Sequence, residues 1–395
     1  MAASAASPEF LSWCCVQGAL HPSCVFKETA RGCGLGGFAT SDIAEGDLII
    51  RVPQAIILTA ASAMQSNSVA RVLRVAADRG RTVSVEVLLF VHMVEQRDSC
   101  SYLRTLSRSF LPCAAAWGDE LEQASGSNLH SHAMAMLQAL RDEHDFIKEA
   151  APDLPIGMDA LLWAFSHYIS RRYPSKLTST STLELLKGCK QTDYFANHLG
   201  NLGAMVPLLD ILNHSGERQW LRLEVSANQR FLDVVCNYPV KAGDEILSNY
   251  GEGLSNEQLL FSFGFSQEAN PHDSVAVRLG GGACTYYIGQ DAQGCAVVPR
   301  ALWEAMQRLL YEEEEDGGEL AVGLCEAQAL LSLMRTRLGA LGGKRKRVRC
   351  EGAREAHLRV YLEGQMRIMD ATVQLLEDIV DQCEEADDGE EVGEY

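Results

Sequence analysis

No stretch of the 395-residue sequence runs for about 18 uncharged apolar residues, the length a membrane-spanning helix needs. The first ten residues hold neither Lys nor Arg and no long apolar run, so they do not resemble a secretory signal. Their Ala and Ser content leaves an organelle transit peptide open, but such peptides need Arg and the first is Arg31. We therefore expect a cytoplasmic protein, with the nucleus as a second location and a plastid less favoured.

Cysteine is present thirteen times, yet no two cysteines form a C-x-x-C pair. Scattered cysteines in an odd number are not typical of a disulfide framework, so reduced thiols fit better. The Cys14-Cys15 pair and His130-x-His132 have no partners at zinc-like spacing. We expect no metal site.

Basic residues are few, since 34 Lys and Arg stand against 53 Asp and Glu and the net charge is −19. Nucleic-acid binding needs a basic face that neutralises phosphates, so we expect no nucleic-acid partner. A basic or lysine-presenting protein is the better matched partner. Twelve of the 53 acidic residues lie in residues 312–316 and 384–395, which have the composition of solvated, mobile segments. The basic run 344–347 is typical of a solvated interhelical loop or of a nuclear-import signal.

The glycines Gly32, Gly34 and Gly37 satisfy the G-x-G-x-x-G pattern of dinucleotide-binding folds. That fingerprint requires a helix to begin at the third glycine and an acidic residue about 20 positions later. Here a turn and an apolar strand follow, and residues 52–62 contain no acid. The pattern therefore does not predict nucleotide binding.

Two β-rich segments lie far apart in the sequence, at residues 24–61 and 202–268. The first contains a Gly-acid turn followed by an apolar strand at 43–50, and the second repeats this design at 240–247. We expect the two segments to meet in one small barrel-like sheet. Between them, and again after residue 279, apolar residues recur at helical spacing.

These patterns predict an α+β protein of two main domains. Its expected parts are an N-terminal helical cap at 1–23, a β-rich core of 24–61 and 202–268, a helical insert at 62–201, an all-helical C-terminal domain at 269–383 and an acidic tail at 384–395.

The block 206–214 is an apolar run that ends in Asp210, Asn213 and His214. Such an ending places hydrogen-bonding side chains at the edge of a packed core, which is typical of a binding site. About forty residues later comes a second polar stretch, which contains Tyr250. We expect the two stretches to form one site.

In this order the motifs resemble those of the SET-domain methyltransferases, within the class that includes the Rubisco large-subunit lysine methyltransferase and an actin histidine methyltransferase. The matching residues are Gly34-Leu35-Gly36 with Asp42-Ile43, Leu209 to His214, Tyr250-Gly251, Asn256-Glu257 and Gly264-Phe265. Less specific matches are Trp163 to Ser166 with Arg171, and Tyr361 with Glu363-Gly364-Gln365. The resemblance covers almost the whole chain. It implies a SET fold split by a helical insert, a C-terminal substrate-binding domain, and S-adenosylmethionine as the methyl donor, with S-adenosylhomocysteine as product.

The resemblance also implies roles for single residues. Tyr250 is expected to line the methyl-transfer channel and to be the catalytic residue, while Asn213 holds the amino-acid end of the donor and His214 contacts its adenine through the main chain. Arg171 would pair with the donor carboxylate, and Asp210 would order the loop that carries Asn213. The remaining donor-site residues are expected to be Gly34, Leu35, Gly36, Gly37, Phe38, Phe263, Gly264 and Phe265. Phe38 departs from the family, which often has a polar residue at this position.

A lysine acceptor must lose its proton before it attacks the donor, because its usual pKa is about 10.4. An apolar channel favours that loss, since burial disfavours the charged ammonium. We therefore predict a methyltransferase that acts on a protein lysine. The cysteine-rich zinc motifs that flank many histone-directed SET domains are missing, so we expect a non-histone substrate. We also expect the protein to be a monomer. Two alternatives stay open: methylation of a protein histidine, and a catalytically silent SET-fold interaction module.

Overall fold

The computed structural model describes residues 8–29, 34–174, 177, 203–279, 284–311, 322–345 and 352–391. The acidic run 312–316 lies outside these residues, as do the side chains of the basic run 344–347. Contacts divide the chain into two units, the first made of Met1–Ala116 and Met136–Glu252 and the second of Trp117–Ala135 and Gly253–Tyr395. The domain boundaries expected from the sequence pattern stay a prediction.

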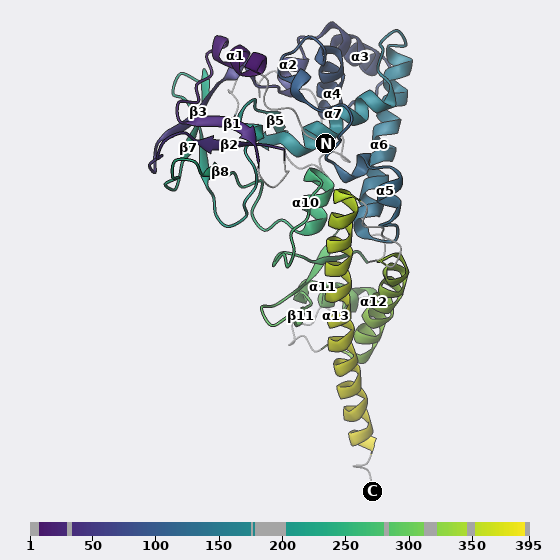
Figure 1. Ribbon diagram of the computed structural model, residues 1–395. Coiled ribbons are helices and arrows are strands. Elements are labelled where there is room, and N and C mark those ends of the chain that lie inside the picture. Colours follow the sequence, from purple (N-terminus) through teal and green to yellow (C-terminus); the bar gives the residue numbers. More distant parts are fainter. Residues whose placement is uncertain are drawn as a thin grey trace. The chain divides into compact units, whose positions relative to one another are not determined.

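The first unit contains two three-stranded antiparallel sheets (Figure 1). One consists of β1 (Cys24–Glu28), β2 (Leu35–Ala39) and β8 (Glu245–Ile246), and the other of β3 (Leu48–Pro53), β7 (Phe231–Cys236) and β6 (Leu221–Val225). In each sheet a strand of the first β-rich segment pairs with a strand of the second, β2 with β8 and β3 with β7. The expected meeting of the distant segments is confirmed.

The described strands of this unit form separate small sheets and not one barrel. The turn between β2 and β3 interrupts the ladder, and Ile43 in that turn forms an isolated bridge with Val240. A third pair joins β4 (Arg172–Pro174) to β5 (Gly203–Met205). Because Gly37 lies inside β2, no helix begins at the third glycine of the G-x-G-x-x-G pattern, which agrees with the sequence analysis.

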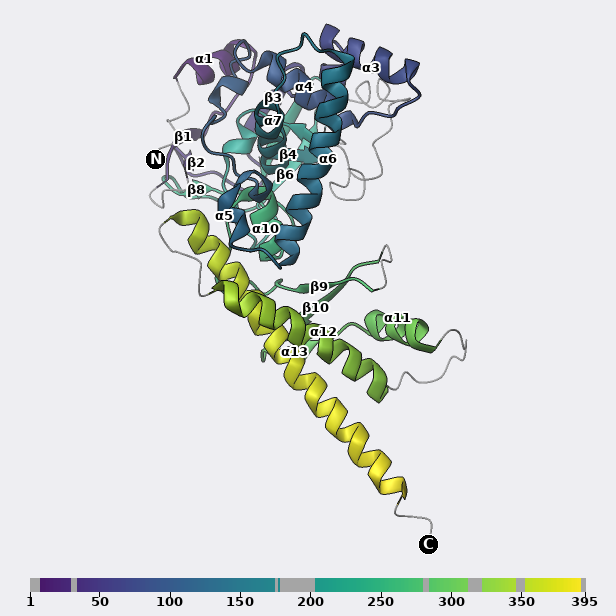
Figure 2. The same cartoon turned by 90° about the vertical axis from the view of Figure 1, so that its right-hand side faces the viewer.

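Helices contribute the largest share of the buried apolar side chains in the first unit, more than its strands or its loops. They are α1 (Pro8–Val16), α2 (Ala60–Ala63), α3 (Asn67–Asp78), α4 (Val85–Gln96), α7 (Met158–Arg171) and the later part of α6 (Asn128–Ala150). Helices α4 and α7 lie side by side (Figure 2), where the ring of Phe90 meets Phe165 and Tyr168 edge to face at 6.0 and 5.3 Å. The buried aromatic cluster confirms the helical periodicity of this segment. Among the described residues, no helix is long and apolar enough to cross a membrane.

The second unit is mainly helical, but the expectation of an all-helical domain at 269–383 is wrong, because this stretch also contains a small sheet. The helices of the unit are α5 (Asp119–Glu122), α10 (Asn256–Phe263), α11 (Arg300–Tyr311), α12 (Leu324–Arg345) and α13 (Ala353–Glu391), and its strands are β9 (Val275–Val277), β10 (Tyr286–Gln290) and β11 (Ala296–Val297). Strands this short leave no clear alternation in the sequence, so the sheet was not foreseen. Helix α13 also runs beyond the predicted helical stretch and takes in residues 384–391 of the expected acidic tail.

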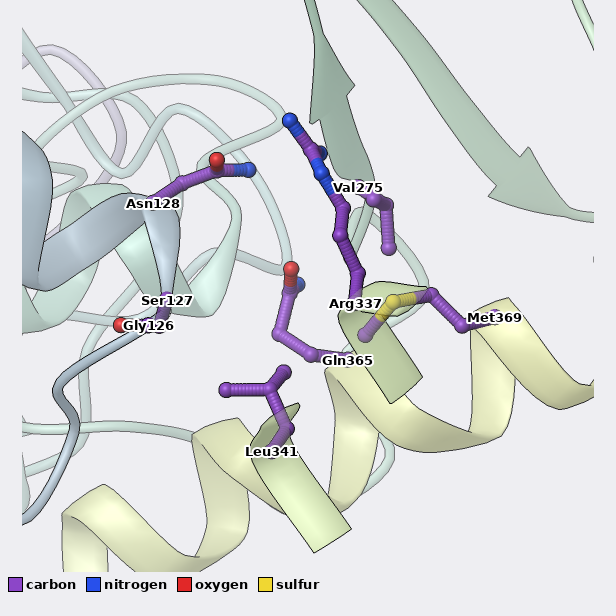
Figure 3. Close-up of a pocket in the computed structure, with 8 residues that line it drawn as sticks. All are labelled: Gly126, Ser127, Asn128, Val275, Arg337, Leu341, Gln365 and Met369. Atoms are coloured by element: carbon purple, nitrogen blue, oxygen red, sulfur yellow. The ribbon is translucent and has the colours of Figure 1, made fainter. Parts of the chain in front are cut away.

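Strand β9 is paired on one side only among the described residues, and side-chain donors cover its other edge. The carbonyl of Ala276 accepts hydrogen bonds from Asn128 at 3.0 Å and from Arg337 at 2.7 Å, and that of Ser274 accepts one from Gln365 at 2.8 Å. These donors line a small pocket in which side chains from three helices converge (Figure 3). Because covered carbonyls cannot pair with another strand, we assign the pocket a structural role.

Two motifs of the sequence analysis meet at Asp273 in this unit. Asn256 donates its main-chain N–H to Asp273 Oδ1 at 2.7 Å and its amide to Oδ2 at 2.8 Å. A Cβ added at Gly364 of α13 would lie 2.8 Å from Asp273 Oδ2. Gly364 is therefore the residue that lets α13 approach the Asn256–Asp273 pair.

Replacement of Gly364 by Ala should lower the free energy of unfolding by about 1–2 kcal/mol, because the new methyl group displaces a buried, hydrogen-bonded carboxylate. Gly339 of α12 is the matched control, since a Cβ there meets nothing within 4 Å. Gly339→Ala should stabilise the protein by up to about 1 kcal/mol through helix propensity. Urea unfolding of both variants tests the packing, and a Gly364→Ala variant as stable as Gly339→Ala would contradict it.

Glu257 at the start of α10 is a buried carboxyl beside Tyr361, whose hydroxyl lies 3.2 Å from Glu257 Oε2. Burial raises the pKa of Glu257 to about 7, while Tyr361 and Arg337 act in the opposite direction and Asp273 adds to the rise. Since the folded pKa lies above the unfolded value of about 4.3, the folded state binds more protons in between. Stability should therefore be full below about pH 4 and decrease as the pH rises to about 7.

The variant Glu257→Gln should lack this part of the pH dependence. Between about pH 4.5 and pH 8 the free energy of unfolding should fall less in the variant than in the wild type. The difference should be on the order of 3 kcal/mol, at 1.36 kcal/mol per pKa unit. Urea unfolding across this pH range measures the difference. The exposed Glu268→Gln is the control and should keep the wild-type slope, and a Glu257→Gln variant that also keeps it would refute the buried carboxyl as its source.

Candidate functional site

The two polar stretches of the sequence analysis lie side by side in the first unit. The Ser248 N–H donates to the Asn213 carbonyl at 2.8 Å, and the Ser215 N–H donates to the Ser248 carbonyl at 2.9 Å. The result is a parallel bridge between His214 and Ser248. In such a bridge the N–H and C=O of His214 itself point away from the paired strand. This geometry suits the predicted main-chain contact of His214 with the donor.

Tyr250 is fastened to the same segment by its main chain and by its side chain. Its N–H donates to His214 Nδ1 at 3.1 Å, and its hydroxyl donates to the Leu212 carbonyl at 3.0 Å. The two rings lie with their centroids 5.0 Å apart. Burial lowers the pKa of His214, which favours the neutral imidazole that the accepting Nδ1 requires. The expected proximity of Asn213 and Tyr250 is confirmed.

The Asn213 side chain links β2, from the first β-rich segment, to β8, from the second. Its amide nitrogen donates to the Leu35 carbonyl at 3.1 Å and to Glu245 Oε1 at 2.7 Å. Both hydrogens of the amide group are therefore used in hydrogen bonds within the protein. The oxygen Oδ1 is the atom of this amide that can accept a hydrogen bond from a donor's ammonium group.

The glycines before and within β2 are required by the protein's own packing. A Cβ at Gly36 would lie 2.5 Å from Glu245 Oε1 and 3.0 Å from Asn213 Nδ2, and one at Gly37 would lie 2.4 Å from a methyl of Leu212. Gly34 has φ of +84°, a left-handed conformation that side chains rarely adopt. Close approach of this backbone to the donor stays a prediction.

Phe38 of β2 lies on the half-exposed face of its sheet. It pairs with Glu245 of β8, and the Lys27 ammonium lies 4.2 Å from the centroid of its ring. A cation above an aromatic face is a favourable contact. Lys27 is thus a partner of Phe38 within the sheet. Contact of Phe38 with the donor stays a prediction.

Arg171 ends α7 and pairs with Asp210, whose side chain is 1% exposed. The Arg171 Nη1 donates to Asp210 Oδ2 at 2.9 Å and to the Asp210 carbonyl at 3.1 Å. Two buried atoms of the pair, Arg171 Nε and Asp210 Oδ1, have no hydrogen-bond partner among the described residues. The pair can therefore still bind a ligand that carries both a carboxylate and an ammonium group.

Two tyrosines of the site were missed in the sequence. Tyr102 donates its hydroxyl to Asp210 Oδ2 at 2.7 Å, and Tyr173 donates to the Leu209 carbonyl at 3.2 Å. Burial raises the pKa of Tyr173 above its usual range, and the neighbouring Tyr250 adds to the rise. The position of Tyr173, two residues after Arg171, could have indicated it, whereas no local signal marks Tyr102.

Phe263, Gly264 and Phe265 lie in the second unit at the end of α10. Gly264 closes that helix with φ of +77°, and its N–H donates to the carbonyls of Leu259 and Leu260 at 3.0 and 3.1 Å. The rings of Phe263 and Phe265 are 6.2 Å apart. These contacts explain the glycine structurally, and the expected place of the three residues beside the donor stays a prediction.

Within the described residues, no three His, Cys, Asp or Glu side chains lie where they could hold a metal ion. The polar groups of the site are instead an amide, an imidazole, phenols and one ion pair. Such a set is suited to an organic ligand held by hydrogen bonds and charge.

Comparison with known proteins identifies the fold. A family model described as the SET domain matches residues 34–251, which is more than half of the chain. The chain belongs to the SET-domain family. The matched segment contains Gly34, Arg171, Asp210, Asn213 and Tyr250, so the predicted family is confirmed, although the motifs after residue 251 lie outside the match.

Curated relatives of this SET-domain chain include the chloroplastic ribulose-1,5 bisphosphate carboxylase/oxygenase large subunit N-methyltransferase of Nicotiana tabacum, 22% identical over 68% of this chain and 53% of the relative. A ribosomal lysine N-methyltransferase of Schizosaccharomyces pombe is 23% identical over 39% of this chain and 25% of the relative. The chain thus spans about half the length of the tobacco protein and less of the yeast one.

Solved structures agree with the fold. The structure of Rubisco LSMT bound to AdoMet superimposes with a TM-score of 0.73 at 17% identity, covering 97% of this chain and 94% of that chain. The SET domain of LSMT bound to MeLysine and AdoHcy gives 0.73 at 18% identity with the same coverage. The SET fold with a helical C-terminal region is therefore confirmed.

Proposed function

We propose that this protein is an S-adenosylmethionine-dependent methyltransferase that methylates a lysine side chain of a non-histone protein. The observation that carries the proposal is the joining of Asn213, His214 and Tyr250 by the Ser248 bridge and the two hydrogen bonds of Tyr250. Residues about forty positions apart thereby form one site in a SET fold. The net charge of −19 favours a basic, lysine-presenting substrate.

The residues of the site fit the chemistry of the donor. Its amino-acid end carries an ammonium and a carboxylate, which match the Asn213 amide oxygen, the Asp210 carboxylate and the Arg171 guanidinium in charge and hydrogen bonding. Arg171 Nε and Asp210 Oδ1 are buried polar atoms without a partner among the described residues, so both can bond to a ligand. When bound, the donor supplies an activated methyl group for displacement by an amine.

Tyr250 is the residue that meets the acceptor. Because its hydroxyl hydrogen is directed to the Leu212 carbonyl, the hydroxyl offers an oxygen lone pair to an incoming amine and orients it for in-line attack. The acceptor must arrive neutral, and burial beside a positively charged donor favours loss of its proton. That proton leaves to solvent before the methyl group is transferred.

Two kinds of similar protein support lysine as the acceptor. The yeast relative is named a lysine N-methyltransferase, and LSMT has been solved with lysine and with methyllysine bound. Histidine is the competing acceptor, and the two differ in the modified residue. Mass spectrometry of the labelled product therefore distinguishes them.

The test is incubation of the purified chain with labelled S-adenosylmethionine and cell lysate. A labelled protein band whose modified residue is lysine is the expected result, and Tyr250→Phe should remove most of the label. Donor binding without any labelled protein would favour the silent interaction module. Absence of both donor binding and label would refute the proposal.

A cytoplasmic or nuclear location remains our proposal for this protein. The tobacco relative is named chloroplastic, so a plastid location is the alternative to be tested. Microscopy of the full chain with a fluorescent tag at its C-terminus distinguishes these compartments.

A further inference from the structure

The Asp210 carboxylate is held by two donors that come from separate parts of the first unit. The Tyr102 hydroxyl donates to Oδ2 at 2.7 Å, and Arg171 Nη1 donates to the same oxygen at 2.9 Å. Tyr102 and the Asp210 side chain are each only 1% exposed. A carboxylate so deeply buried needs hydrogen bonds to offset its lost hydration. The phenol provides one of them without adding a charge.

Tyr102 is itself held in place from the opposite side. Phe10 of α1 stacks on its ring with centroids 6.2 Å apart, and Phe10 in turn stacks on Trp13 at 6.1 Å. The Tyr102 carbonyl accepts a hydrogen bond from the Thr105 hydroxyl at 2.6 Å. Burial raises the pKa of Tyr102 well above its usual range, and Asp210 adds to the rise, so the phenol keeps its proton. The hydroxyl is therefore a fixed donor.

Asp210 connects the fixed Tyr102 hydroxyl to the residues expected to bind the donor. Its carbonyl accepts a second hydrogen bond from Arg171 at 3.1 Å, and it lies in the turn that leads to Asn213. Since Oδ2 takes both donors, Oδ1 stays without a partner among the described residues, as does Arg171 Nε. The direction of both atoms depends on where Oδ2 is held.

We infer that Tyr102 is a positioning residue for donor binding, which acts by fixing the Asp210–Arg171 pair through its hydroxyl. The inference rests on the proposed function of this site. It adds a residue of the helical insert to the machinery of the SET fold, and it couples helix α1 to the site through Phe10.

The test is Tyr102→Phe, which keeps the ring and its stacking on Phe10 and removes only the hydroxyl. Calorimetry should show S-adenosylmethionine binding weakened about 10-fold, the loss expected for one hydrogen bond to a charged group. The KM for the donor should rise by the same factor. The kcat at saturating donor should stay within about twofold, because the group at the acceptor is unchanged.

Tyr168→Phe is the matched control. Tyr168 is equally buried, and its hydroxyl accepts the Gly203 N–H at 2.8 Å without contacting Asp210. This variant should lose a similar amount of stability in thermal unfolding and keep the wild-type donor affinity. Equal weakening of donor binding in both variants, or wild-type affinity in Tyr102→Phe, would overturn the inference.

A wild-type chain that binds no donor would contradict the proposed function and the donor-binding part of the inference, but not the fixing of the Asp210–Arg171 pair by the Tyr102 hydroxyl. In that case a double-mutant cycle of Tyr102→Phe with Arg171→Lys, followed by thermal unfolding, tests this fixing directly. Non-additive effects would support a shared anchor at Asp210, and strictly additive effects would refute it.

Discussion

Replacement of Tyr250 by Phe is expected to lower methyl transfer about 100-fold, the usual effect of removing one well-placed hydroxyl from a reaction centre. The hydroxyl donates to the Leu212 carbonyl at 3.0 Å, so the lone pairs of its oxygen have a fixed direction, and we expect the amine to meet them. Phe keeps the ring beside His214 but offers no oxygen. Donor affinity should stay within about twofold, because the main-chain bond from Tyr250 to His214 is retained.

The loss of turnover must be separated from a loss of fold. Tyr250→Phe also removes a hydrogen bond to a carbonyl, which should cost about 1 kcal/mol of stability. The exposed Tyr238→Phe serves as the control for tyrosine replacement and should keep full activity. Single-turnover assays with saturating donor measure the transfer step, and unchanged turnover in Tyr250→Phe would remove this residue from the mechanism.

Replacement of Asn213 by Ala is expected to weaken donor binding by about 10- to 100-fold, equivalent to about 1.4–2.7 kcal/mol. Two effects contribute to this loss. The amide oxygen that would accept from the donor is removed, and the bonds to the Leu35 carbonyl and Glu245 at 3.1 and 2.7 Å are broken. Strands β2 and β8 thereby lose the side chain that joins them. Calorimetric titration with S-adenosylmethionine measures the effect.

Two further variants separate the effects at Asn213. Gly36→Ala keeps the amide and places a methyl group 2.5 Å from Glu245 Oε1, so it should disturb the Asn213–Glu245 bond and weaken binding less. Glu245→Gln keeps an accepting oxygen and should bind nearly as well as wild type. Equal donor affinity in Asn213→Ala and wild type would refute the assigned role of the amide.

Much of the core could be predicted because its signals are local and repeated. The same turn-and-strand design occurs at residues 43–50 and 240–247, and these two stretches meet at the Ile43–Val240 bridge. In both three-stranded sheets of the first unit, a strand of residues 24–61 pairs with a strand of residues 202–268. The sheet of β9, β10 and β11 could not be predicted, since its strands are 2 to 5 residues long. Long helices such as α13 were predicted in place but not in length.

The site was predictable only as far as its motifs reach. The proximity of Asn213 and Tyr250 followed from two polar stretches that end apolar runs, and the Ser248 bridge bears it out. The Arg171–Asp210 pair and its bond to Tyr102 depend on three segments that only tertiary packing brings together. Sequence periodicity carries no information on which buried hydroxyl meets which buried carboxylate.

The most direct test of a donor site around Asn213 and Tyr250 is a structure of the chain determined with S-adenosylhomocysteine bound. We predict that its amino-acid end lies against Asn213, Asp210 and Arg171, and its adenine against the main chain of His214. The Tyr250 hydroxyl should lie at the sulfur end, next to the opening for the acceptor. A ligand bound elsewhere on the chain would contradict this assignment. So would a calorimetric titration that shows no binding even at a large excess of S-adenosylhomocysteine.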